Sequence, residues 1–235
     1  METARPYPNP VATLEVEARG AFLVKVYQHL VAALVAFLAF EVLLFSTGIA
    51  EAMYDFLAGS GAAWLLVLGA FMVINWMATA AAHDLDDPGR QYLGLFGVAA
   101  GEALIFAPFL YYVFEAAGGT STIASAAAIT AVGFAGLTAV GLITRADLSF
   151  LRPMLMWGGI CALVLIGAAL LFGLDLGIWF SVGMIALAGA SILYQTQTIL
   201  RVYPEQAHVG AAVQLFASVM LLFWYVLRLV AAARN

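Results

Sequence analysis

Seven long apolar stretches fill most of this chain, and they limit its fold more than any other feature. They cover residues 24–45, 62–82, 92–114, 123–143, 155–172, 177–194 and 211–230. A helix needs about 20 mainly apolar residues to cross the hydrocarbon core of a bilayer. The chain is also 65% hydrophobic and only 10% charged, which is far too apolar for a soluble domain of 235 residues. We therefore predict an all-α polytopic membrane protein, a bundle of seven transmembrane helices.

The connections between these stretches are short, so no soluble domain is expected. We predict one transmembrane domain at residues 22–235, preceded by a cytoplasmic tail at residues 1–21. Only a small turn around Gly173 and Asp175 separates the fifth and sixth stretches, which predicts a tight helical hairpin. Cys161 is the only cysteine and lies inside the fifth stretch, so an intrachain disulfide is excluded.

Basic residues occur in the N-terminal tail and in alternate connections. They are Arg5, Arg19, Lys25, Arg90, Arg145, Arg152 and Arg201. The positive-inside rule then places the N-terminus in the cytoplasm and, with seven spans, the C-terminus outside. Arg228 and Arg234 oppose this orientation, which leaves the alternative that the last segment does not fully cross. We predict a multi-pass protein of a bacterial inner membrane, with an organelle as the alternative location.

Polar side chains inside the spans are the candidate functional residues, because each is costly in hydrocarbon. Glu102 lies near the middle of the third stretch, where a carboxylate must be protonated, paired or facing water. It is a candidate to relay protons or line a conduit; the structural alternative is a hydrogen bond to a carbonyl freed by Pro108. Glu41 lies toward the outer end of the first stretch, and we expect its carboxylate to reach the interface.

The last stretch carries an ordered polar face. At 100° per residue, Gln214, Ser218, Tyr225 and Arg228 share a face about 80° wide that rises about 21 Å. Gln195 lies at the end of the sixth stretch that meets the start of the last one. It is therefore placed to contact Gln214 or Ser218. Such contacts are either hydrogen bonds that hold helices together, worth about 1 kcal/mol each, or part of a polar pathway or gate.

Small residues offer close-packing surfaces on two helices. Gly97 and Gly101 form a small-xxx-small face in the third stretch. The fourth stretch carries a similar set, formed by Ala127, Ala128, Ala131, Gly133, Ala135, Gly136 and Ala139. We interpret both sets as surfaces for helix packing.

Several function classes are excluded by what the chain lacks. There is no Gly-x-Ser-x-Gly nucleophile, no phosphate loop, no basic patch for nucleic acid, and no lysine in a late span for retinal. The three histidines, His29, His83 and His208, have no zinc-like spacing. We therefore predict that the protein is not an enzyme, holds no cofactor or metal, and binds no nucleic acid.

Three motifs follow one another in the second half of the chain. Residues 144–151 read Thr-Arg-Ala-Asp-Leu-Ser-Phe-Leu, residues 192–199 read Ile-Leu-Tyr-Gln-Thr-Gln-Thr-Ile, and residues 214–229 run from Gln-Leu-Phe to Leu-Arg-Leu. In this order and spacing they resemble the Thr-Lys-Lys-Asp-Leu-Ser-type loop, the Leu-Tyr-Asp-Thr-Gln-x-Ile signature and the last helix of the Bax inhibitor-1 (transmembrane Bax inhibitor motif) family. The resemblance covers essentially residues 20–231 and is to the bacterial type of member.

The resemblance implies a seven-helix bundle whose last helix is wrapped by the others. It also implies a pH-sensitive calcium leak switched by two facing aspartates in the last two helices. One branch of the family instead modulates a membrane-anchored ATP-dependent protease. In this chain Gln195 and Ser218 occupy the two aspartate positions, and Met77–Ala80 replaces a basic cluster at the end of the second span. Neither Gln195 nor Ser218 titrates near neutral pH. We therefore do not assign the calcium-leak role of the two aspartates to these residues.

Two hypotheses follow for the function. The first is a pH-linked cation leak, for calcium or protons, whose candidate pathway or gate contains Gln195, Gln214, Ser218, Arg228 and Glu102, with Glu102 as the mid-membrane acid. The second is a non-conducting accessory subunit that binds a membrane protease or another membrane complex through its small-residue faces. In both cases the lipid bilayer is the expected surrounding.

Overall fold

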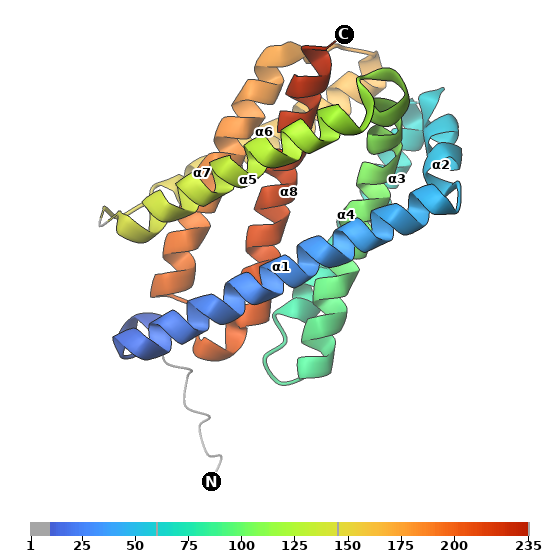
Figure 1. The fold of residues 1–235 in the computed structure, drawn as a ribbon. Coiled ribbons are helices and arrows are strands. Elements are labelled where there is room, and N and C mark those ends of the chain that lie inside the picture. Colours follow the sequence, from blue (N-terminus) through green and yellow to red (C-terminus); the bar gives the residue numbers. More distant parts are fainter. Residues whose placement is uncertain (1–9, 60, 145, 235) are drawn as a thin grey trace.

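The computed structural model describes residues 10–59, 61–144 and 146–234, and within these ranges the chain forms helices and no β-strand (Figure 1). The α-helices are α1 (Val16–Ser46), α2 (Ile49–Ala58), α3 (Gly61–Ala82), α4 (Pro88–Ala116), α5 (Gly119–Ile143), α6 (Leu151–Phe172), α7 (Gly177–Arg201) and α8 (His208–Ala232). Two short 3-10 helices, η1 (Val11–Thr13) and η2 (Glu205–Ala207), precede α1 and α8. All α-helices except α2 are long and apolar enough to cross a membrane, which confirms the predicted seven-span architecture.

Some of the sequence positions used above fall outside the described ranges. These are residues 1–9 of the predicted tail, which include Arg5, together with Arg145 and the last residue of the predicted domain, Asn235. Within the described part, Val11 donates a backbone hydrogen bond of 2.8 Å to the carbonyl of Tyr203, between α7 and α8. The start of the chain and the α7–α8 loop therefore mark one end of the bundle, called here the N-terminal end. The α6–α7 turn and the end of α8 mark the other, called the C-terminal end (Figure 1).

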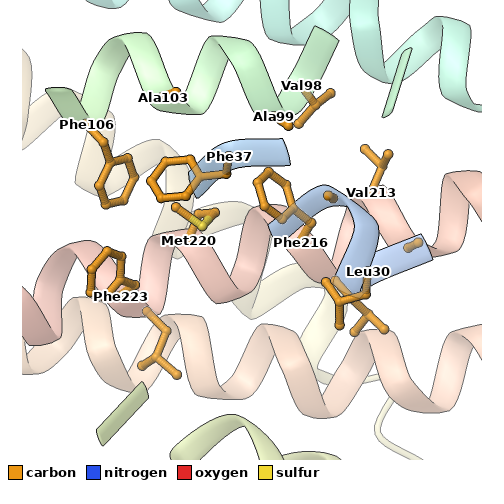
Figure 2. Close-up of a cluster of buried hydrophobic side chains, with 14 of the residues drawn as sticks. Leu30, Phe37, Val98, Ala99, Ala103, Phe106, Val213, Phe216, Met220 and Phe223 are labelled. Atoms are coloured by element: carbon orange, nitrogen blue, oxygen red, sulfur yellow. The ribbon is translucent and has the colours of Figure 1, made fainter. Parts of the chain in front are cut away.

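Two helices, α4 and α8, form the centre of the bundle. Most of their length is buried, whereas α3 and α6 expose most of theirs. Figure 2 shows the core between α4 and α8, where the rings of Phe106 and Phe223 stack with centroids 5.6 Å apart. Phe37 from α1 adds an edge-on contact to Phe106 at 5.4 Å. The last helix is therefore wrapped by others, as the family resemblance implied, and α4 shares the central position.

Helix α1 is longer than the span predicted for it. Its 31 residues begin at Val16 rather than at residue 24. At 1.5 Å per residue the helix is about 46 Å long, which exceeds a hydrocarbon core of about 30 Å. A helix of this length fits a bilayer by tilting, and α1 runs obliquely across the other helices in Figure 1.

The expectation that Glu41 reaches the membrane interface is wrong. Its side chain is 6% exposed, and neither carboxyl oxygen has a hydrogen-bond partner among the described residues. The reason is the helix face on which it lies. Phe37 and Leu44, four residues before and three after it, are also buried, so Glu41 belongs to the stripe of α1 that packs into the bundle.

The short helix α2 was not predicted. Ala50 and Leu57 are its buried residues, while Glu51 and Asp55 are exposed. Tyr54 packs against Tyr111 of α4 with ring centroids 5.6 Å apart. Helix α2 therefore covers part of α4 at the C-terminal end of the bundle without spanning the membrane.

Glycines of α4 allow it to approach α3 closely. A Cβ atom at Gly97 would lie 3.2 Å from the Cβ of Ala78, and one at Gly101 would lie 3.8 Å from Ile74. Gly94, one turn earlier, is tighter still: a Cβ there would overlap the backbone nitrogen of Ala82. The small-xxx-small face predicted for this helix thus packs against α3, and it extends to Gly94.

Gly94→Leu is therefore expected to lower the free energy of unfolding by about 1–3 kcal/mol through overpacking of the α3–α4 contact. The measurement is the Tm of the purified protein in detergent. Gly136→Leu in α5 is the matched control, because a Cβ at Gly136 meets nothing within 4 Å. Equal Tm values for the two variants would contradict the close α3–α4 packing.

Candidate functional site

A closed ring of three side chains joins α7 to α8. The side-chain nitrogen of Gln195 donates to the hydroxyl of Ser191 at 3.1 Å, and the hydroxyl of Ser218 donates to the side-chain oxygen of Gln195 at 3.0 Å. The two serine hydroxyl oxygens are 3.0 Å apart. Since a hydroxyl has a single proton, Ser191 must donate the third bond to Ser218. We call Gln195, Ser191 and Ser218 the amide–hydroxyl ring.

The structure brings together Gln195 and Ser218, one of the two pairs that the topology allowed. Gln214 is used elsewhere: its side chain interacts with the phenol of Tyr203 in the α7–α8 loop. Burial raises the pKa of Tyr203 to about 12, so the phenol is protonated at physiological pH. Gln214 thus fastens the start of α8 to this loop and is not part of the ring.

A cavity of about 680 Å³ lies among α3, α4, α6, α7 and α8. Its wall includes Ser218, Tyr225 and Arg228 from α8, together with Glu102 from α4. Three of the four residues on the predicted polar face of the last helix therefore share one cavity. Along α8 the wall extends from Ser218, a member of the amide–hydroxyl ring, to Arg228. Arg228 lies beside the α6–α7 turn at the C-terminal end.

Glu102 is the acid at the inner part of this cavity. Its side chain is 7% exposed, and within the described residues it has neither a hydrogen-bond nor an ion-pair partner. The neighbouring Gly101 lies near Phe71 of α3, which also lines the cavity. The α4 wall continues toward the C-terminal end through Ile105 and Phe106. The carboxyl group therefore borders apolar surface, and Ser218 of the amide–hydroxyl ring lines the same cavity.

Arg228 has an acidic neighbour at the other end of the cavity. One of its terminal nitrogens lies 4.0 Å from a carboxylate oxygen of Asp175. The same oxygen accepts a hydrogen bond of 2.9 Å from the backbone nitrogen of Gly177, which fixes the turn between α6 and α7. Asp175 was predicted only as part of a tight turn. Its role in the cavity wall depends on how the hairpin packs beside α8, which its local sequence does not encode.

The first two sequence motifs contact each other directly. The side-chain nitrogen of Gln197 donates to the carbonyls of Thr144 at 3.1 Å and Ala146 at 2.8 Å. Its side-chain oxygen accepts from the backbone nitrogen of Leu148 at 3.2 Å. One buried glutamine on α7 thus holds the whole loop between α5 and α6.

Asp147 gives this loop its turn. One carboxylate oxygen accepts from the backbone nitrogen of Ser149 and the other from its hydroxyl, each at 3.0 Å. These two hydrogen bonds, with Arg201 nearby at 3.7 Å, hold the pKa of Asp147 below its usual range. The Asp147 carboxylate is therefore ionised at physiological pH and lies beside a basic residue at the end of α7.

Some polar residues of the bundle were missed by sequence reasoning. Ser191 completes the amide–hydroxyl ring, and its position four residues before Gln195 was the available signal. His29 and His208, assigned only as loop or interface residues, meet at the N-terminal end with ring centroids 4.8 Å apart. Within the described part of the chain, no group of three or more histidine, cysteine or acidic residues is arranged to hold a metal ion.

Comparison with known proteins agrees with this architecture. The family model described as "Inhibitor of apoptosis-promoting Bax1" matches residues 19–235. An uncharacterized protein of Neisseria meningitidis serogroup A is 27% identical over 178 residues, which cover 74% of this chain and 76% of the relative. An uncharacterized protein of Pseudomonas aeruginosa is 40% identical over 111 residues, 45% of this chain and 47% of the relative. The matched residues include every span, the loop held by Gln197 and the ring between the last two helices, and the chain belongs to the Bax inhibitor-1 family of integral membrane proteins.

Proposed function

We propose that this protein is a cation leak, for calcium or protons, whose path runs through the cavity at Glu102. The observation that carries the proposal is the cavity of about 680 Å³ between Glu102 and the C-terminal end of the bundle. A carboxylate is the ligand type that calcium prefers and a group that can exchange protons. Glu102 and Asp175 are the two acids in the wall. A cation on this path would meet Glu102 at the inner part of the cavity and Asp175 at the C-terminal end.

The amide–hydroxyl ring is the proposed closed gate of this path. It joins α7 to α8 at the inner part of the cavity, and passage beyond it requires the ring to open. The side chains of Gln195, Ser191 and Ser218 do not titrate near neutral pH, so proton dependence in this protein is assigned to Glu102 instead. In this proposal the gate and the titrating group are different residues. In the aspartate pair that the family resemblance implies, the same two residues would serve as both.

The test is cation flux in proteoliposomes at pH 6 and pH 8. Glu102→Gln is expected to lower calcium flux about tenfold, which corresponds to about 1.4 kcal/mol, by removing the one acid at the inner part of the cavity. Glu41→Gln is the matched control, because Glu41 is equally buried but does not line the cavity. Flux no greater than that of empty vesicles at both pH values would overturn the proposal.

The proposed location is a bacterial inner membrane with the N-terminus in the cytoplasm. The support is the alternation of basic residues among the loops: Arg90 and Arg201, for example, lie beside loops at the N-terminal end of the bundle. Protease digestion of an N-terminal tag in sealed inverted vesicles, with protection in right-side-out ones, is the expected outcome. The reverse pattern would contradict this orientation.

A second candidate function, that of an accessory subunit, is favoured by the outward face of α5. The small residues predicted to pack are mostly exposed, namely Ala127, Ala128, Ala131, Ala135, Gly136 and Ala139. They leave a smooth helix surface on which another transmembrane helix can pack closely. On this hypothesis the partner is a membrane protease or another membrane complex.

Gly136→Leu is then expected to abolish recovery of the partner in a mild-detergent pulldown from the native membrane. Gly69→Leu in α3 is the control, since a Cβ at either position meets nothing within 4 Å of its own chain. Purification of the unaltered protein only as a free monomer would count against the accessory role.

A further inference from the structure

The cavity beside Glu102 combines aromatic rings with an acid. Its wall includes the aromatic side chains of Trp64, Phe71, Phe106, Phe180, Trp224 and Tyr225. The faces of such rings are electron-rich and attract cations, with about 0.5–2 kcal/mol gained per well-placed contact. The wall is otherwise mainly aliphatic, and the volume of about 680 Å³ is within the usual range for small-molecule sites.

The charges in the wall are not balanced. It contains two acids, Glu102 and Asp175, and one basic residue, Arg228. Arg228 lies 4.0 Å from Asp175, so this pair compensates itself at the C-terminal end. Glu102 has no partner among the described residues, although its side chain is only 7% exposed. The inner part of the cavity therefore offers one uncompensated carboxyl group inside an aromatic and aliphatic wall.

We propose that this cavity binds a hydrophobic organic cation, whose single charge pairs with Glu102 and whose aromatic or alkyl groups contact the cavity wall. A cation whose charge is shielded by its own hydrocarbon groups gives up little hydration on entering this apolar space. A hydrophobic anion of the same size would place its charge against the Glu102 carboxylate. Charge and lining together thus select one class of ligand.

This inference goes beyond the proposed leak, although both use Glu102 and the same cavity. Binding requires only the cavity that the structure shows, whereas a leak also requires the amide–hydroxyl ring to open. The two are tested separately, because binding is measured on the full chain in detergent, where there is no flux. Loss of flux with intact binding would overturn only the leak.

The probe is tetraphenylphosphonium, compared with tetraphenylborate, which has the same shape and the opposite charge. Equilibrium dialysis or calorimetry on the purified protein at pH 8 is expected to show saturable binding of one phosphonium per chain. The borate is expected to bind at least about tenfold more weakly, a difference of about 1.4 kcal/mol. Equal or tighter binding of the borate to the unaltered protein would overturn the proposal without any mutation.

Variants then locate the site. Glu102→Gln is expected to weaken phosphonium binding about tenfold or more, while Glu41→Gln, the other buried glutamate, leaves it unchanged. Ala162→Phe adds a ring at a buried position of the wall and is expected to block binding of both ions. Thermal unfolding in detergent verifies that each variant is folded. Phosphonium binding that is equal in folded Glu102→Gln or Ala162→Phe would place the ligand elsewhere and overturn the assignment.

Discussion

The double variant Gln195→Asp with Ser218→Asp is expected to lose much more stability than the unaltered protein as pH rises. In the native ring the facing oxygens of these two side chains are 3.0 Å apart and neither group carries charge. Two carboxylates at this distance repel when both are ionised. In the unfolded protein the two groups are far apart, so the repulsion acts on the folded state alone.

The sign follows from proton binding. Because the folded double variant holds a proton between its two carboxyl groups more tightly than the unfolded chain does, its free energy of unfolding falls as pH rises. Two unit charges about 4 Å apart interact by about 4 kcal/mol at an effective dielectric constant of about 20. At roughly 2–4 °C per kcal/mol, this predicts a fall in Tm between pH 5 and pH 9 that exceeds that of the unaltered protein by roughly 10 °C.

The measurement is the Tm in detergent across this pH range. Gln195→Asn with Ser218→Asn is the matched control, because it disturbs the same hydrogen bonds without adding a titrating group. Its Tm is expected to be lower than that of the unaltered protein but to follow the same pH profile. If the aspartate variant also followed that profile, the two side chains would not face each other across α7 and α8.

The seven spans could be predicted because their cause is local. A span of about 20 apolar residues is visible in the sequence itself, and the alternation of loops then places the ends of the last two helices side by side. That topology was enough to bring Gln195 near Ser218. It could not choose between Ser218 and Gln214, because the choice depends on the rotation of α8 and on Tyr203, which occupies Gln214.

Polar residues made the ends of the helices harder to predict. The sixth span was predicted to end at residue 194, where a polar run begins, but α7 continues to Arg201. The run stays helical because the protein itself satisfies it: Gln195 bonds to serines, and Gln197 bonds to the α5–α6 loop. Hydropathy treats such residues as facing water and cannot show that their partners lie on other helices.

The cavity was beyond sequence reasoning for a related reason. It is a gap among five helices, so no single segment encodes it. The two span glutamates illustrate the difference. Glu41 and Glu102 are similarly buried, but only Glu102 borders the cavity. From their positions along the helices, Glu41 was predicted to reach the interface and Glu102 to lie in mid-membrane. The surroundings of both side chains depend instead on how the neighbouring helices pack.

Gln197→Leu is expected to release the loop between α5 and α6, since it removes three hydrogen bonds at once. The carbonyls of Thr144 and Ala146 and the backbone nitrogen of Leu148 would each lose the partner that the buried glutamine supplies. Each polar group left unsatisfied costs about 1–3 kcal/mol, less where water can replace the partner. Because the loop lies at the end of the bundle, water is available, and we expect a net loss of about 2–4 kcal/mol.

Hydrogen exchange of the loop amides measures this loss locally. With about 1.4 kcal/mol for each factor of ten, the variant is expected to exchange about 30-fold to several hundredfold faster at residues 146–149. Thr198→Ala is the control, because among the described residues the hydroxyl of Thr198 bonds only to the carbonyl of Tyr194, within α7.

Gln197→Glu separates the contribution of the side-chain oxygen, which accepts a hydrogen bond, from that of the side-chain nitrogen, which donates two. It keeps an acceptor for Leu148 but loses both donors, and it places a carboxylate against two carbonyl oxygens and near Asp147. Its loop is therefore expected to exchange at least as fast as that of Gln197→Leu. Slow exchange in Gln197→Glu would mean that the acceptor bond to Leu148 alone holds the loop, and that the two carbonyl contacts add nothing to it.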